Sequence, residues 1–413
     1  MKYLFYLGAF IVFNFNSYSQ QLKPISKSST QKFNVPNDFC GTDEIHKEKM
    51  KNDRKYRLRH LKTIENIKQA QINPRYGEEI HQVPVVVHVM HKGEAVGEGS
   101  NISDADVRAG IKYLNNFWRK IQGTNGDGYG VDMQIEFALA VQDENGDCTN
   151  GIVHVDMSDV SAYVDHGVNR SNSDGLDDYE SDEAVNSLKE YSIWDPTKYY
   201  NVWLVDEIDD SNCSSGGTAG YATYASSHGQ AYDGTVVRIC TYLDESKTTW
   251  AHEMGHAFNL PHTFDGDDDS GDGIYTCGED GIFDTPSHIR ASSSELNIYW
   301  DCDNDDVNDC DPDFNVQMSP GHIGNGTHQD HIHNYMSYSG CRNEFTGGQS
   351  VVSKSALMNE RASFLPENGN TALVPASVAD VYFSVAGSAV CYLVRLHLKM
   401  NQLVLRILIP MLL

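Results

Sequence analysis

The chain has 413 residues, which is enough for two or three domains, and 40% of them are apolar, which is enough for a sizeable core. Its formal net charge of −27 argues against nucleic acid or an anionic membrane as a partner, because both repel an acidic surface. The nine cysteines are an odd number, so at least one of them does something other than pair within the chain.

A basic start of the chain precedes a short apolar run, residues 3–15, and then small polar residues. This order is typical of a secretory signal peptide, which we expect to cover residues 1–19. The run is too short for a comfortable membrane span, so we expect no stable membrane insertion. Export would place the cysteines in an oxidising compartment, where disulfides persist.

Residues 20–79 form a polar stretch rich in Lys, Ser, Asn and Gln, with weak periodicity. It contains Cys40-Gly41-Thr42 and basic sites at 54–55 and 57–59. Two interpretations stay open for this stretch, a linker and a removable pro-segment. We expect the pro-segment.

The next segments alternate between strand and helix patterns. Residues 83–90 are a β-branched apolar run, typical of a buried strand. A helix should follow, capped by Ser103 with Asp106 three residues later. Its buried face should comprise Val107, Ile111, Leu114, Trp118 and Ile121. Further strands are expected at residues 133–141, 200–205 and 235–240. The series predicts an α/β domain with a mixed sheet.

A long helix with metal-binding potential should come next, capped by Asp244 or Ser246. It carries the pattern His-Glu-x-x-His, in which His252 and His256 are four residues apart and therefore lie on one helix face. Both can bind one metal ion from the same side. Glu253 lies one residue further round and can reach a water on that ion.

Asn259 follows where this helix should stop, and Asn is the best non-Gly residue for a left-handed turn. The turn would bring His262 back as a third nitrogen ligand. Three neutral imidazoles with one open position describe a catalytic zinc rather than a closed structural one. The alternative is an ordinary amphipathic helix with three surface or core histidines.

Residues 264–338 have little regular structure and are dense in Gly and Asp. A long irregular region inside a domain needs another device to fix it, and disulfides and metal ions are the usual ones. We expect at least one structural Ca²⁺, with candidate ligands Asp265, Asp267, Asp269, Asp272, Asp280 and Asp284. The alternative is a solvated acidic loop.

The turn at residues 334–338 holds Met336, about seventy residues after the histidines. Metzincins place a Met in a tight turn beneath the zinc after such an interval. Residues 366–413 become strongly apolar and basic near their end, without the length and purity of a membrane span. We expect a C-terminal tail there, possessing at most a truncated accessory domain.

Several segments together resemble the pappalysin family of metzincin proteases, which includes the ulilysin-like enzymes. They are residues 83–90, 194–199, 248–264, 283–286, 334–338 and 345–349. The resemblance implies a metzincin-type zincin fold for the catalytic domain, residues 80–365. Such a fold has a mixed twisted sheet and the active-site helix in an N-terminal subdomain. Its C-terminal subdomain is irregular, stabilised by disulfides and calcium, and contains the Met-turn.

The resemblance also implies roles for single residues. Cys40 would bind the zinc in a latent form, as a thiolate does well; the alternative is a disulfide, for example with Cys148. Tyr338 would donate a hydrogen bond to the developing oxyanion, or else be a packed turn aromatic. Two crossed bridges are implied, Cys277–Cys310 and Cys302–Cys341. From the residues alone, Cys213 and Cys240 are a further candidate pair.

These observations predict a secreted, zinc-dependent endopeptidase that is made as a latent zymogen. Glu253 would be the general base, and the partners would be protein or peptide substrates of a monomeric enzyme. The rival hypothesis is a catalytically inactive, calcium-stabilised binding or adhesion module on the same fold. The presence of Glu253 argues against that rival.

Overall fold

A computed structural model describes residues 38–74, 76–170, 176–177, 187–266, 278–287, 333–338 and 342–375. Residue contacts divide the chain into residues 1–34 and residues 35–413, and all described residues belong to the second unit. The predicted signal peptide and most of the predicted C-terminal tail lie outside the described residues.

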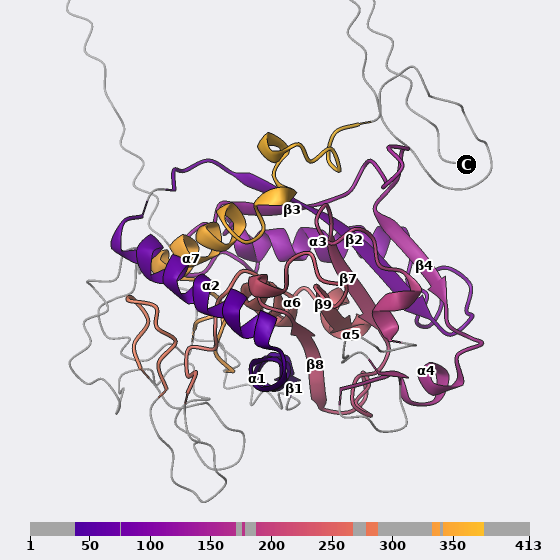
Figure 1. The fold of residues 1–413 in the computed structure, drawn as a ribbon. Helices are drawn as coiled ribbons and strands as arrows, with labels where there is room; N and C mark the ends of the chain where they lie inside the picture. The colour runs from indigo at the N-terminus through magenta and orange to yellow at the C-terminus, as the bar shows by residue number, and fades with distance from the viewer. Residues whose placement is uncertain are drawn as a thin grey trace, which may run out of the picture. The chain divides into compact units, whose positions relative to one another are not determined.

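A mixed β-sheet forms the centre of the fold (Figure 1). Its strand order is β1-β8-β9-β7-β2-β3, and β4 also pairs with β2. The strands are β1 (Asp38–Cys40), β2 (His81–His91), β3 (Ile135–Leu139), β4 (Ile152–Asp156), β7 (Tyr200–Val205), β8 (Gly217–Ala222) and β9 (Thr235–Arg238). All pairs are parallel except β8 with β9, which is antiparallel. The predicted mixed sheet is therefore confirmed.

The long strand β2 is buried on both faces, which explains its unbroken apolar sequence. Alternate residues Val83, Val85, Val87 and Val89 join the core on one face. Val86 and Met90 belong to separate clusters. His88 between them is buried and bonds Asn201 of the neighbouring strand at 2.9 Å.

Helices on the main core face carry the predicted apolar positions. Helix α3 (Asp104–Trp118) begins at Ser103 with the predicted capping box to Asp106. Ile121 is 42% exposed, so its placement on the buried face was wrong; the helix ends at Trp118 and Lys120 has a positive φ of 47°. The predicted strand 235–240 is also shorter, because Cys240 already lies in helix α5 (Ile239–Leu243).

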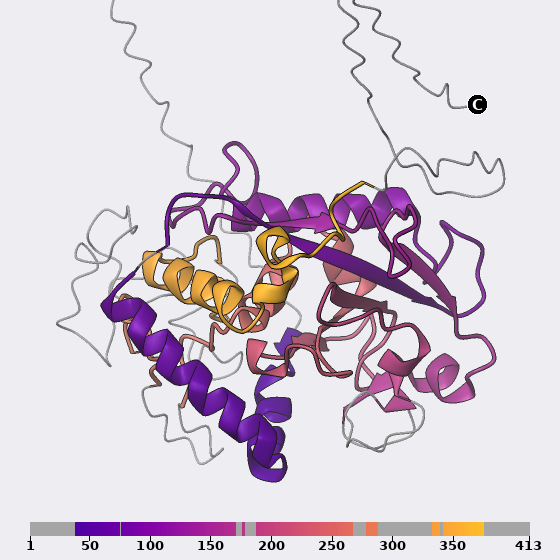
Figure 2. The same ribbon diagram turned by 45° about the horizontal axis from the view of Figure 1, so that its top comes forward.

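The segment before β2 forms two helices, α1 (Thr42–Asn52) and α2 (Arg54–Ile72), with Asp53 capping the second. Helix α2 packs against α7 (Gly347–Met358), and the two run side by side in Figures 1 and 2. The interpretation of residues 38–72 as a linker is therefore wrong. This segment is folded against the rest of the domain.

The remaining elements are short. They are α4 (Ser161–His166), β5 (Val168–Asn169), β6 (Leu176–Asp177), η1 (Leu188–Tyr191), η2 (Ala225–Ser227), α6 (Thr249–Ala257), η4 (Ala362–Phe364) and η5 (Pro366–Asn368). Within the described residues, no helix is long and apolar enough to cross a membrane.

The cysteines behave in part as expected. Cys213 and Cys240 form the suspected disulfide. Cys40 is free and buried, and Cys148 is disulfide-bonded, so the alternative that pairs these two is wrong. The predicted bridges Cys277–Cys310 and Cys302–Cys341 lie outside the described residues.

Candidate active site

The short helix α6 carries the first two histidines. It begins after Thr248, not at Asp244 or Ser246 as predicted. Ser246 instead donates to the Asp244 side chain from both its hydroxyl, at 2.6 Å, and its backbone, at 2.9 Å, in the preceding turn. Every residue of α6 is buried, and His252 and His256 lie one turn apart.

Asn259 makes the turn that follows α6. Its φ is +67°, the left-handed conformation that the sequence predicted for this position. Its side-chain oxygen accepts a hydrogen bond from the backbone N–H of Ala225 at 3.0 Å. This contact gives Asn an advantage over Gly, which reaches the same φ but offers no acceptor.

The turn brings His262 to the other two histidines. The three Nε2 atoms lie 3.1 to 3.2 Å from one another. The Nδ1 atoms of His252 and His256 contact the carbonyl oxygens of Tyr335 and Leu260, at 2.6 and 2.7 Å. A carbonyl only accepts, so each of these Nδ1 atoms carries the proton and each Nε2 presents a lone pair.

Converging lone pairs repel one another unless a cation lies between them. Ligands at the usual Zn–N distance of about 2.0–2.1 Å place neighbouring nitrogens of a tetrahedron roughly 3.3 Å apart, close to the observed spacing. The Cys40 sulfur completes a buried group of four potential ligand atoms, all within 4.8 Å of one another. In the part of the chain that the structure describes, this is the one such group of three or more. Its donor set fits zinc.

Glu253 lies beside this group and is fully buried. Its Oε2 accepts from the Cys40 thiol at 3.3 Å and from the Thr42 hydroxyl at 3.4 Å. Burial raises the pKa of Glu253 to about 8, although the hydrogen bonds from Cys40 and Thr42 lower it. Its Oε1 is buried without a hydrogen-bond partner. The carboxylate is therefore placed to hold a proton next to the metal group.

Asp43 contacts the third histidine, His262. The sequence reasoning missed this role of Asp43. Its Oδ2 lies 3.0 Å from Nδ1 of His262. Burial opposes its ionisation, but His262 and His256 outweigh burial and hold the pKa of Asp43 well below its usual range. The signal available in the sequence was an acidic residue three positions after Cys40. Carboxylates commonly orient metal-binding histidines in this way.

Two residues of the 334–338 turn border the site. Met336 is buried with its sulfur against Gly255 of α6, where an added Cβ would collide with it. The ring of Tyr338 lies 4.8 Å from that of His262, and its hydroxyl donates to the Cys40 carbonyl at 3.4 Å. The structure thus places both predicted residues next to the histidines.

The calcium candidates are only partly described. Asp267, Asp269 and Asp272 lie outside the described residues. Asp280 accepts from Thr285 and from the backbone of Ile282, and Asp284 accepts from Thr346 and the backbone of Gly348. Burial raises the pKa of Asp265, Asp280 and Asp284. Taken alone, these three do not form an ion-binding group.

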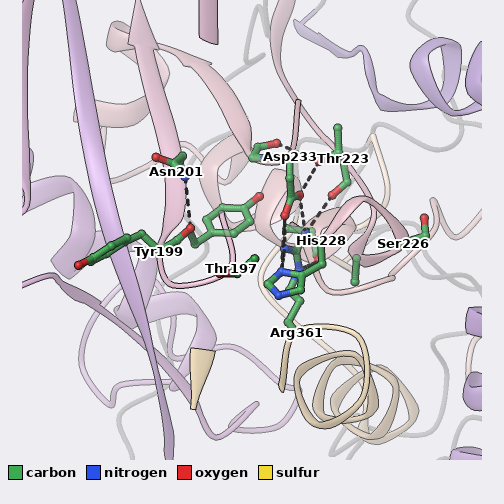
Figure 3. A network of polar contacts seen from close by, with 12 residues as sticks. Thr197, Tyr199, Asn201, Thr223, Ser226, His228, Asp233 and Arg361 are labelled. Carbon is green, nitrogen blue, oxygen red and sulfur yellow. Dashed lines mark hydrogen bonds and ion pairs between the residues drawn. The ribbon is translucent and has the colours of Figure 1, made fainter. Parts of the chain in front are cut away.

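A buried polar network supports the end of α6, and the sequence reasoning missed it as well (Figure 3). Arg361 donates from Nε to the carbonyl of Ala257 at 2.8 Å. Its other nitrogens bind both carboxylate oxygens of Asp233, at 2.6 and 2.9 Å. Asp233 also accepts from Thr223 at 2.8 Å. The network ties the last turn of the histidine helix to the segment after α7.

The fold and the site together define a class, an α/β domain with a three-histidine metal site and an adjacent glutamate, as in metallopeptidases. Residues 179–358 match the family model described as pregnancy-associated plasma protein-A, the M43 peptidases. The predicted resemblance to the pappalysin family is thereby confirmed.

Individual relatives agree with this match. An extracellular metalloprotease of Verticillium alfalfae is 34% identical over 158 residues, which are 35% of this chain and 47% of that protein. The alignment thus spans about half the length of that relative. A structure of a promirolysin mutant from Tannerella forsythia superposes with a TM-score of 0.52 and 21% identity, covering 79% of this chain and 97% of the other. That likeness concerns the fold. The family match and the Verticillium alfalfae relative support the prediction of a metalloendopeptidase.

Proposed function

We propose that the protein is a secreted, zinc-dependent endopeptidase, held latent by its own N-terminal segment. One observation carries this proposal. The ring nitrogens of His252, His256 and His262 converge beside the Glu253 carboxylate, and the Cys40 sulfur completes a buried group in which the four potential ligand atoms lie within 4.8 Å of one another. Three imidazoles with one exchangeable position are typical of catalytic zinc.

Zinc bound there would polarise the scissile carbonyl and lower the pKa of a water molecule. Glu253 takes the proton of the attacking water and passes it to the leaving amine. Its position beside the converging histidine nitrogens suits a group that alternates between carboxylate and acid. The Tyr338 hydroxyl, which donates to the Cys40 carbonyl in this structure, donates to the substrate oxygen as negative charge develops on it.

The latent form follows from how the N-terminal segment lies in the site. Strand β1 pairs in parallel with β8, at the edge of the sheet next to Glu253. This leads Cys40 onto the histidines and closes the edge to a peptide substrate. Removal of residues 20–79 as a pro-segment frees both.

Processing should occur in the exposed stretch between α2 and β2. Residues 77–80 are exposed there and belong to no helix or strand. The basic sites at 54–55 and 57–59 lie inside α2 instead. A peptidase needs an extended substrate, so a site in the stretch 73–80 is favoured over one in the helix.

Secretion and calcium complete the proposal. The signal-like residues 1–19 and a relative described as extracellular support export.

Calcium binding is supported by the buried carboxylates of Asp280 and Asp284, and Oδ2 of Asp280 has no hydrogen-bond partner. A cation there would offset the burial of charge. EGTA should then lower the melting temperature of the zinc-loaded protein, and an unchanged value would refute the calcium site.

The test compares full-length wild type with Glu253→Ala and Cys40→Ala on a proteome-derived peptide mixture, with products read by mass spectrometry. Zinc is measured in each protein. We expect cleavage by activated wild type and none by Glu253→Ala with zinc still bound. Unprocessed Cys40→Ala should cleave more than unprocessed wild type but less than the activated enzyme, because β1 still covers the edge of the sheet. A folded, zinc-loaded wild type that cleaves nothing after removal of its N-terminal segment would favour the binding-module hypothesis.

A further inference from the structure

Arg170 is a fixed cation beside the metal site that the proposed chemistry does not use. It follows strand β5, and only 16% of its side chain is exposed. Asp209 accepts from its backbone N–H at 2.8 Å and from Nε at 2.7 Å, and Nη2 lies 2.6 Å from the same carboxylate as an ion pair. Nη2 also donates to the Thr218 hydroxyl at 3.0 Å. These contacts hold the guanidinium in one orientation.

The guanidinium lies against the N-terminal segment, one residue from the zinc-facing thiol. Gly41 directly follows Cys40, and a Cβ at Gly41 would collide with the guanidinium of Arg170. Thr218, which Arg170 binds, belongs to β8 and pairs with Phe39 of β1. Arg170 therefore borders the edge that a peptide must occupy.

One donor of Arg170 points away from the catalytic domain and toward the N-terminal segment. Nη1 donates to the carboxylate of Glu44 at 3.1 Å. The Glu44 side chain is 70% exposed and lies in the first turn of α1. Asp209 and Thr218 engage Nε and Nη2 and stay with the domain when the segment leaves. Glu44 leaves with the segment, so Nη1 of Arg170 then faces the peptide substrate that takes the segment's place.

We propose that Arg170 forms a subsite for a substrate carboxylate within two residues of the scissile bond, occupied by Glu44 in the latent protein. The inference rests on the proposed peptidase function and adds a preference for acidic peptides. A guanidinium already oriented by Asp209 binds a carboxylate with little loss of side-chain entropy. One hydrogen bond between charged groups corresponds to roughly 10-fold or more in the specificity constant.

The first experiment uses matched peptides that carry Glu or Gln at each position near the cleaved bond. The enzyme is produced as the full-length protein and then activated by removal of its N-terminal segment. Three proteins are compared: wild type, Arg170→Gln and Arg170→Lys. We expect wild type to favour Glu over Gln by about 10-fold in kcat/KM at one of these positions. Arg170→Gln should bring the ratio to about 1, and Arg170→Lys should retain part of it. Because each protein is its own reference, a general loss of activity does not change the ratio.

A wild type that cleaves peptides without preferring Glu, or an equal preference in Arg170→Gln, would overturn the inference. A wild type that cleaves nothing refutes the proposed function instead, and the second experiment then decides on Arg170 without relying on activity. It measures alkylation of the buried Cys40 thiol in the latent full-length protein. Glu44→Gln should speed alkylation several-fold, because the contact to Arg170 is weakened. The matched control is Glu48→Gln, because Glu48 is an exposed residue one turn further along α1. This control should leave the alkylation rate unchanged. Equal rates for the two variants would overturn the inference.

Discussion

Replacing Arg361 by Met should destabilise the protein severely. The side chains of Arg361 and Asp233 are 0% and 2% exposed, and they form a bidentate ion pair. The substitution leaves the Asp233 carboxylate buried with two weaker side-chain partners, the Thr223 hydroxyl and His228, whose Nδ1 lies 3.8 Å from it. It also removes the donor to the Ala257 carbonyl at the end of the histidine helix.

The expected loss follows from the burial of the pair. Removing one partner of a buried, hydrogen-bonded ion pair costs about 3–5 kcal/mol, since the other charge stays uncompensated. Domains are stable by about 5–15 kcal/mol, so this loss is about a fifth or more of the total. Part of it should appear as weaker zinc binding, because α6 supplies His252 and His256.

Urea unfolding followed by tryptophan fluorescence measures this loss, since Trp118, Trp203 and Trp250 are buried. The matched control is Arg108→Met. Arg108 pairs with Asp104 four residues earlier on the surface of α3, and its side chain is 52% exposed. Such a pair contributes about 0.5 kcal/mol or less. If the two variants differed by less than about 1 kcal/mol, the reasoning that the Arg361 network holds the helix would be refuted.

Three further predictions concern the turn, the interface of the N-terminal segment and its removal. Asn259→Ala should lower the free energy of unfolding by about 2–3 kcal/mol in urea, because Ala disfavours φ of +67° and leaves a buried N–H unpaired; Asn259→Gly should lose less. Burial and His60 lower the pKa of His46 to about 4, so docking of the segment is full above pH 6.5 and weakens as the pH falls toward 4. Alkylation of any thiol slows as the pH falls, because the thiolate is the reacting form, so the Cys40 rate is read as the ratio of wild type to His46→Phe at each pH. That ratio should rise as the pH falls over this range, and a constant ratio would contradict the assignment. Mass spectrometry of the activated protein should find its N-terminus within residues 73–80, whereas a cut at 54–59 would show that α2 opens first.

Local patterns in the sequence were sufficient for the parts of this protein that depend on near neighbours. Two histidines four residues apart share a helix face whatever surrounds them, and the left-handed turn at Asn259 follows from its own side chain. The capping box at Ser103 is likewise a contact over three residues. A similar box, Thr346 with Gln349, begins α7 and is equally a contact over three residues.

Contacts between distant segments were decided only by the tertiary structure. The sequence does not bring Asp43 to His262, 219 residues away, or Arg361 to Asp233, 128 residues away. The family resemblance predicted Cys40 as a zinc ligand, and the pairing of β1 with β8 is what brings its sulfur to the three histidines. The start of α6 differs from the prediction for a local reason, since Asp244 and Ser246 hydrogen-bond to each other in the preceding turn. Periodicity encodes which face of an element is apolar, whereas the packing of elements decides which polar groups meet there.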